Sequence, residues 1–177
     1  MCFHGSNADS PSHITHIVIM ISNNFLELVQ TRQSDRRYLK KPVEKDKIDR
    51  CLIAAQLAPS ACNSQPWKFI VIDDPHIKDK IVEETSEPIV PINKFTKQAP
   101  VLVVVVMEKP NLTSKLGEMI RDKKFTLIDI GIATEHFCLQ ATQEGLGTCI
   151  LGWFNEKKVK QILGIPKPLR AVLIITL

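Results

Sequence analysis

The stretch of sequence that decides the fold is APSACNSQPW, residues 58–67. It joins the end of a predicted helix to the start of a predicted strand, and its prolines restrict the backbone. The side chains of Ser60, Asn63 and Gln65 can form hydrogen bonds with the polar edge of a planar heterocycle. The structural alternative is a proline-bounded turn held by its own hydrogen bonds, and on these residues alone a ligand role for Asn63 and Gln65 needs further evidence. For Trp67 we favour the structural role, an anchor for the strand in the core.

The segments on either side of this stretch have clear periodicities. Apolar residues recur every three or four positions from Lys45 to Ala58, which predicts an amphipathic helix that Pro59 ends. Two apolar runs downstream, Phe69 to Ile72 and the valine-rich Val101 to Val106, predict buried strands. The stretch 58–67 therefore belongs to a helix–loop–strand unit.

The remaining elements follow from the same periodicities and from turn residues. They are a short first helix from Asn23 to about Arg32, a surface helix from Pro75 to Glu84, a loop from Ser86 to Lys97, a long central helix from Thr126 to Glu144 that Gly145 ends, a short strand from Thr148 to Leu151, a helix that Asn155 caps and Gly164 ends, and a strand from Ala171 to Leu177. This order predicts an α+β sandwich of helices on a small sheet.

Composition excludes several classes of function. The chain has 177 residues, 44% hydrophobic and 24% charged, which is typical of one soluble globular domain. Its formal net charge is +4, but the positive residues are scattered among acidic ones, so we expect no nucleic-acid partner. The apolar stretch Ile17 to Ile21 is too short to span a bilayer, and we expect no signal peptide and no membrane partner.

The cysteines and the N-terminal residues predict neither disulfides nor a metal site. The five cysteines form no CxxC pair, which favours reduced thiols in a cytoplasmic protein. Residues 1–22 are an unpatterned extension, and we expect the folded domain to comprise residues 23–177. The extension contains His4, His13 and His16, but no acidic or cysteine partner stands at ligand spacing.

Two further segments carry candidate binding residues. The stretch TRQSDRRY, residues 31–38, places three arginines and a serine between two helices, a plausible anion site. On these residues alone, a basic linker whose arginines pair with acids such as Asp35 is favoured. In GLGTCILGWF, residues 145–154, Gly152 allows close backbone approach to a flat ligand, whereas Gly145 and Gly147 could equally be turn residues.

Taken together and in this order, the three segments resemble the FMN-dependent nitroreductase family, from Phe25 to Leu177. The resemblance implies an α+β sandwich of helices around a small mixed sheet. It also implies a homodimer with one FMN in each of two interface clefts. Family members usually continue beyond the last strand with a glycine turn and a basic tail, whereas this chain ends at Leu177.

The resemblance also assigns residues to the cofactor. Arg32 and Ser34 match positions near the FMN phosphate and ribityl chain, with Gln33 beside them. Arg36 matches a basic position beside the flavin pyrimidine, where its charge would stabilise the anionic reduced ring. The positions that match the loop contributed by the partner subunit are Pro59, Ser60, Ala61, Asn63 and Gln65, and those near the reactive edge of the ring are Leu151 and Gly152.

The implied reaction is ping-pong. NADH or NADPH passes a hydride to FMN and leaves, and an acceptor such as a nitroaromatic or a quinone then takes its place. No side chain is assigned as acid or base. Two alternatives remain: a truncated paralogue that binds FMN or dimerises without turnover, motivated by the missing tail, and a related dehalogenating or flavin-fragmenting enzyme, which we rank lower because the chain has little room for a lid.

Overall fold

The computed structural model describes residues 25–86, 92–109 and 124–177. Two compact units divide at Thr31 and Arg32. In the first unit a helix covers residues 25–31, within the range expected for the first helix. The second unit contains every strand described below. The extension of residues 1–22, its histidines and the expected capping asparagines lie outside the described residues.

The second unit is built on a four-stranded sheet in the order β1-β2-β4-β3. Each neighbouring pair is antiparallel. The strands are β1 Trp67–Ile72, β2 Leu102–Met107, β3 Cys149–Leu151 and β4 Arg170–Thr176. The α+β class is confirmed, but the expected mixed sheet is antiparallel in its strands. The valine run could not reveal strand direction, because a strand covered on both faces has the same apolar pattern in either orientation.

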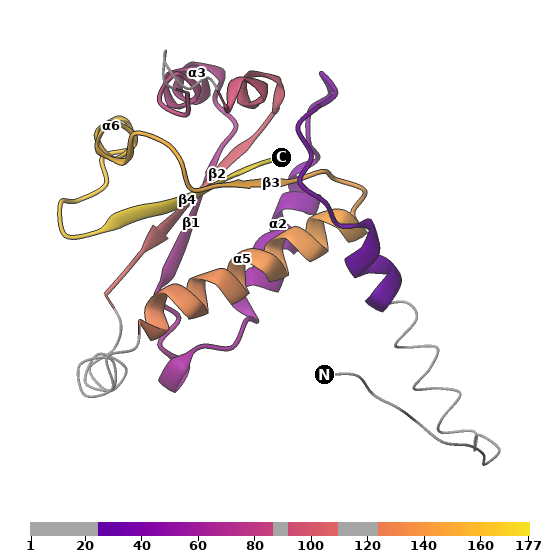
Figure 1. Ribbon diagram of the computed structural model, residues 1–177, viewed down its shortest axis with the longest axis vertical. Coiled ribbons are helices and arrows are strands. Elements are labelled where there is room, and N and C mark those ends of the chain that lie inside the picture. Colours follow the sequence, from indigo (N-terminus) through magenta and orange to yellow (C-terminus); the bar gives the residue numbers. More distant parts are fainter. Residues whose placement is uncertain (1–24, 87–91, 110–123) are drawn as a thin grey trace. The chain divides into compact units, whose positions relative to one another are not determined.

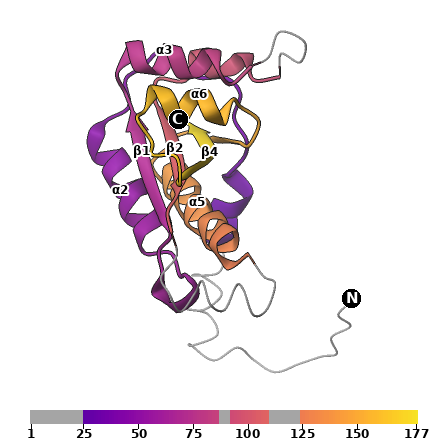
Figure 2. The same ribbon diagram turned by 90° about the vertical axis from the view of Figure 1, so that its left-hand side faces the viewer.

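Helices cover both faces of this sheet (Figure 1). Figure 2 shows the same layers from the side that carries α6. The strand β2 connects the layers, since its side chains alternate between two cores. Val103 and Val105 belong to the core beneath α2 and α5, whereas Val104 belongs to the core beneath α3 and α6. The helices are α2 Lys45–Gln56, α3 Pro75–Glu83, α5 Phe125–Gln143 and α6 Glu156–Ile162.

The ends of the helices follow their sequence signals. Asn155 caps α6 as predicted, because its side chain accepts a hydrogen bond from the N–H of Lys158 at 3.3 Å. Gly145 follows α5 with a positive φ of 73°, and Leu146 N–H donates to the Ala141 carbonyl at 2.8 Å. Gly164 likewise has a positive φ, 64°, after α6. Both glycines therefore end helices as expected.

The loop expected from Ser86 to Lys97 contains a 3-10 helix, η2 Lys94–Gln98. Asn93 fixes its start by donating its side-chain amide to the carbonyls of Thr85 and Trp153, each at 2.9 Å. The hydroxyl of Thr96 then donates to the Asn93 carbonyl at 2.9 Å. The bond between Asn93 and Trp153 joins residues 60 positions apart in the sequence, a contact that local patterns could not predict.

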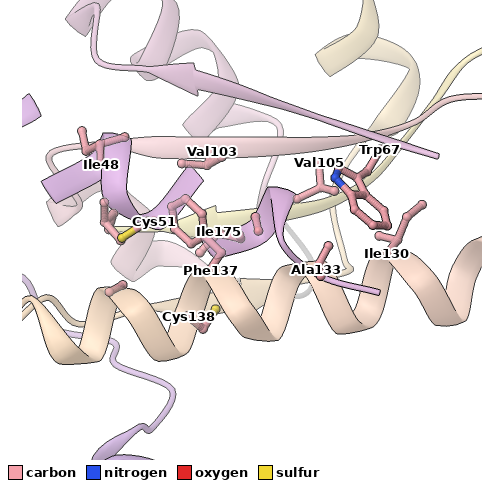
Figure 3. Packing of buried hydrophobic residues seen from close by; sticks show 14 of the residues in the cluster. Ile48, Cys51, Trp67, Val103, Val105, Ile130, Ala133, Phe137, Cys138 and Ile175 are labelled. Atoms are coloured by element: carbon pink, nitrogen blue, oxygen red, sulfur yellow. The ribbon is translucent and has the colours of Figure 1, made fainter. Parts of the chain in front are cut away.

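The core beneath α2 and α5 positions the loop of residues 58–67. Trp67, the first residue of β1, is buried, and Figure 3 shows it beside Val105 and Ile130. Phe69 stacks on Phe137 of α5, with ring centroids 5.8 Å apart. The structural role predicted for Trp67 is therefore confirmed. Within the described ranges, no helix is long and apolar enough to cross a membrane.

Candidate functional site

The loop between α2 and β1 has an unusual backbone. It contains the 3-10 turn η1 Ala61–Asn63. Positive φ angles occur at Cys62, Asn63 and Gln65, with values of 53°, 49° and 44°. For residues other than glycine such angles cost about 1–3 kcal/mol each, and they persist only where the surroundings hold them. This loop therefore stores strain at three positions within four residues.

Side-chain hydrogen bonds hold this backbone in place. The Ser60 hydroxyl accepts from the N–H of Gln65 at 2.9 Å, and the side-chain amide of Gln65 donates to the Gln56 carbonyl at 3.1 Å. The N–H of Ala61 donates to Oδ2 of Asp129, a buried residue of α5, at 3.1 Å. Ser60 and Gln65 thus serve the loop itself, as the structural explanation requires, whereas Asn63 is exposed.

The arginine segment lies beside the start of β3. Ser34 and Thr148 form an isolated parallel bridge, and the N–H of Asp35 donates to the Thr148 carbonyl at 2.8 Å. Since β3 continues to Leu151 and then Gly152, the segment and these two residues belong to one region of the molecule. The sequence places them more than a hundred positions apart.

The arginines do not pair as a basic linker would. Arg32 Nε contacts Glu135 Oε1 of α5 at 3.2 Å, and Asp35 accepts instead from the side chain of Gln33 at 3.1 Å. Arg36 is exposed, with one guanidinium nitrogen 3.4 Å from the Ser34 carbonyl and its central carbon 5.9 Å from the centre of the Phe95 ring. The exposed charge of Arg36 is therefore available to a ligand.

Burial raises the pKa of the neighbouring Cys149 thiol, and the positive charge of Arg36 partly opposes this rise. The Cys149 side chain itself is buried, which keeps it out of contact with solvent.

The three glycines of this region differ in what they allow. Gly145 ends a helix, as described above. A Cβ at Gly147 would lie 2.6 Å from Oδ2 of Asp35, so any larger residue there would require the Asp35 side chain or its segment to shift. A Cβ at Gly152 would meet no atom of the described residues within 4 Å, which leaves open space beside its backbone in that part of the chain. Gly145 is therefore a turn residue, whereas Gly147 leaves room for the Asp35 side chain.

The structure brings the arginine segment together with residues 147–152, but it does not bring the 58–67 loop to them. Figure 1 shows the loop that follows α2 at one end of α5, away from the segment that precedes α2. Asp129 holds the loop and Glu135 pairs with Arg32. These two acids lie about 9 Å apart along α5 and about 120° apart around it. The candidate residues therefore form two separate groups. We call residues 32–36 with residues 147–152 the arginine half-site, and residues 58–67 the loop half-site. No contact between the two groups is found in the described part of the chain.

Exposed apolar side chains lie near the loop half-site. Ile53 of α2 and Leu57, which directly follows α2, are 54% and 76% exposed. On α5, Leu127 and Ile128 are 46% and 57% exposed. We call these four residues the α2/α5 patch. Leu57, Leu127 and Ile128 each lie within four residues of the hydrogen bond between Ala61 and Asp129. Exposed apolar side chains that lie close together can mark an interaction surface. Sequence analysis missed this patch and the two acids of α5, because an exposed leucine or a paired glutamate has no distinctive local signal.

Comparison with known proteins identifies the family. Residues 29–94 and 89–177 match the model of the nitroreductase family. An Archaeoglobus fulgidus protein, whose assigned name is NADH dehydrogenase/NAD(P)H nitroreductase, is 32% identical over 146 residues, which cover 80% of this chain and 77% of that protein.

Solved structures give the same result. A nitroreductase family protein from Clostridium novyi NT is similar with a TM-score of 0.75 and 32% identity, covering 86% of this chain and 82% of that one. An FMN-dependent nitroreductase from Clostridium difficile R20291 is similar with a TM-score of 0.69 and 27% identity, covering 85% and 84%. This chain belongs to the nitroreductase family of oxidoreductases.

Proposed function

We propose that this protein is an FMN-dependent oxidoreductase that uses NADH or NADPH to reduce nitroaromatic, quinone or similar acceptors. When bound, FMN would supply the ping-pong hydride chemistry, first accepting a hydride from the nicotinamide and then reducing the acceptor. The observation that carries the proposal is the pair of half-sites: a basic segment beside an open glycine backbone, and a strained loop with an exposed amide. Family membership supports the same assignment.

The arginine half-site has the donors that an FMN phosphate requires. Arg32 uses its Nε toward Glu135, so its two terminal nitrogens keep the forked geometry that matches phosphate oxygens. The exposed Ser34 can add a hydroxyl donor, and Gln33 lies beside it. We assign these three residues to the phosphate and ribityl chain.

The ring would lie over the open backbone of Leu151 and Gly152. No atom of residues 25–86, 92–109 or 124–177 occupies the space where a side chain at residue 152 would stand, so a flat ring can approach the main chain closely. The exposed guanidinium of Arg36 would then stabilise the negative charge that reduction places on the ring. We assign no side chain as nucleophile, acid or base.

The loop half-site would complete the flavin site of a second copy of the chain. In one chain the two half-sites lie at different places along α5, and we propose that the loop residues of each flavin site come from a partner. We propose that this contribution comes from Pro59, Ser60, Ala61, Asn63 and Gln65. The homodimer would also cover the α2/α5 patch, which has four large apolar side chains exposed to solvent in the single chain.

The test is a measurement of bound cofactor and of turnover. Purified protein, denatured to release its ligand, should yield close to one FMN per chain, and it should oxidise NADH or NADPH when a quinone or nitroaromatic is present. Protein that is colourless and takes up no added FMN would contradict the proposal. Tightly bound FMN without oxidation of either nucleotide would favour the alternative of a binding or dimerising paralogue without turnover.

A further inference from the structure

We propose that Asp129 is a positioning residue that sets the conformation of the loop at residues 59–65 and, through it, the affinity for FMN. The inference rests on the proposed function in one respect, namely that this loop borders the flavin. Asp129 itself contacts the loop backbone, so its effect on the cofactor is indirect.

The location of Asp129 needs an explanation other than packing. The residue lies within α5 and is 5% exposed, among the buried side chains of Thr126 and Ile130. Aspartate is an unfavourable residue in the interior of a helix, and burial of a carboxylate is costly unless hydrogen bonds compensate for it. The bond from the N–H of Ala61 provides such compensation, and it joins α5 to the first residue of η1.

The contact lies where the strained backbone begins. Ala61 comes directly before Cys62 and Asn63, both of which have left-handed φ angles. Two other side-chain bonds of the loop stay within residues 56–65, whereas Asp129 belongs to a long helix that is packed in the core. Strained conformations persist when their surroundings fix them, and Asp129 supplies a fixed point outside the loop.

The same helix also holds the other half-site, because Glu135 of α5 pairs with Arg32. One rigid element thus carries an acid for each half-site, which fixes the loop and the arginine segment of one chain relative to the same helix. A change at Asp129 should therefore disturb only the loop and leave the Arg32 contact in place. This separation makes the inference testable.

Three variants separate the role of the acceptor from that of the side-chain volume. Asp129→Ala removes the carboxylate that accepts the hydrogen bond from Ala61 N–H. Asp129→Val also removes this acceptor, but its larger side chain fills more of the volume that the aspartate occupies. Asp129→Asn keeps the size and one acceptor oxygen. The matched control is Thr134→Val, since Thr134 is another buried polar residue of α5 and its hydroxyl has no partner among the described residues.

Two measurements are needed on each variant: hydrogen exchange of the peptide that contains Ala61 to Gln65 in FMN-free protein, and the Kd for FMN from fluorescence quenching. We expect Asp129→Ala and Asp129→Val to exchange faster in this peptide and to bind FMN about tenfold more weakly. Asp129→Asn and Thr134→Val should both stay within about threefold of the parent Kd. Thermal unfolding shows whether each variant is folded.

The outcomes separate this inference from the proposed function. If the parent protein binds no FMN, the proposed function fails, and the exchange measurement still tests whether Asp129 holds the loop. If the parent binds FMN but a folded Asp129→Ala or Asp129→Val variant keeps the parent exchange rate and Kd, the inference is wrong and the function stands. If Asp129→Ala does not fold, Asp129→Val provides the answer, and an Asp129→Asn variant as weak as Asp129→Val would also contradict the role of the acceptor.

Discussion

The position that a Cβ of Gly147 would occupy lies 2.6 Å from Oδ2 of Asp35 and 2.9 Å from its Cγ. Asp35 is fixed from the other side, since its N–H donates to the Thr148 carbonyl at 2.8 Å. With the Asp35 side chain in its present position, a side chain at residue 147 would overlap it, so the arginine segment docks beside β3 next to a residue without a side chain. This contact connects a glycine near the end of the chain to the residues that we assign to the FMN phosphate.

Gly147→Ala should displace the arginine segment. The added methyl group overlaps Asp35, and overpacking of this kind costs about 1–3 kcal/mol of stability. We expect the Kd for FMN to rise roughly tenfold, measured by fluorescence quenching. In the double variant Gly147→Ala/Asp35→Ala the overlapping oxygen is gone, so affinity should recover in part. A single Gly147→Ala variant with parent affinity would show that the docking of this segment does not matter for the cofactor.

A cluster of charges joins the C-terminal end of α5 to α2 and makes stability dependent on pH. Arg50 donates two hydrogen bonds to Glu144, each 2.7 Å long, and a third of 2.9 Å to Asp46. The bonds from Arg50 lower the pKa of Glu144 below its ordinary value of 4.5. Since the folded-state pKa is the lower one, this stabilisation is complete above pH 4.5 and is lost as the pH falls through the folded-state pKa.

Glu144→Gln should therefore lower the free energy of unfolding at pH 7 and reduce the further loss of stability below pH 4.5. Urea unfolding at pH 7, 5 and 3 tests both expectations. Glu83→Gln, at an exposed position of α3, is the matched control. If the Glu144→Gln and parent proteins lose stability in parallel between pH 5 and 3, the contact with Arg50 is not the cause of the acid sensitivity.

Thr134→Val should leave the protein as stable as before or make it more stable. The Thr134 hydroxyl is buried and has no hydrogen-bond partner in the ranges that the structure describes, so valine of similar shape removes an uncompensated polar group. We expect the free energy of unfolding to rise by up to about 1 kcal/mol in urea titrations. A clear loss of stability would mean that the hydroxyl has a partner, such as a bound water.

Leu57→Glu should dissociate the proposed dimer. Leu57 directly follows α2, is 76% exposed and belongs to the α2/α5 patch. A carboxylate buried in an apolar interface is costly. Sedimentation or light scattering should show a rise of at least roughly thirtyfold in the dissociation constant. Ile77→Glu, at a 40% exposed position on α3, is the control and should leave assembly unchanged. Equal effects of the two substitutions would contradict the assignment of the patch to the interface.

Local sequence signals predicted the elements well and their contacts poorly. The three- and four-residue periodicity predicted α2 and α5, and Asn155 and Gly145 marked helix ends, because each of these signals acts within a few residues. The direction of the strands was not predictable, since burial of β2 on both faces is independent of it.

Side-chain partners that are distant in the sequence were beyond the same reasoning. If the arginine segment were only a basic linker, Arg32 was expected to form an ion pair with a neighbouring acid such as Asp35. Its partner is instead Glu135, which is more than a hundred residues away in the sequence. Ser60 and Gln65 were candidate ligand contacts, and in the structure their side chains also form hydrogen bonds that hold the loop. The left-handed backbone at Cys62 and Gln65 was not predictable from the propensities of cysteine and glutamine. The geometry of the site arises from tertiary contacts with α5.

The central claim is that one flavin site needs residues from two chains, and mixed dimers test it most directly. Arg32→Ala removes the residue of the arginine half-site that we assign to the FMN phosphate, and Asn63→Ala removes one residue of the loop half-site. Each variant alone should bind FMN poorly, because both sites of its dimer are damaged. A mixed dimer purified through two different tags has one intact site and one doubly damaged site, so it should bind about half as much FMN as the parent dimer. Mixed dimers that bind no more FMN than either variant alone would show that each site is built from a single chain.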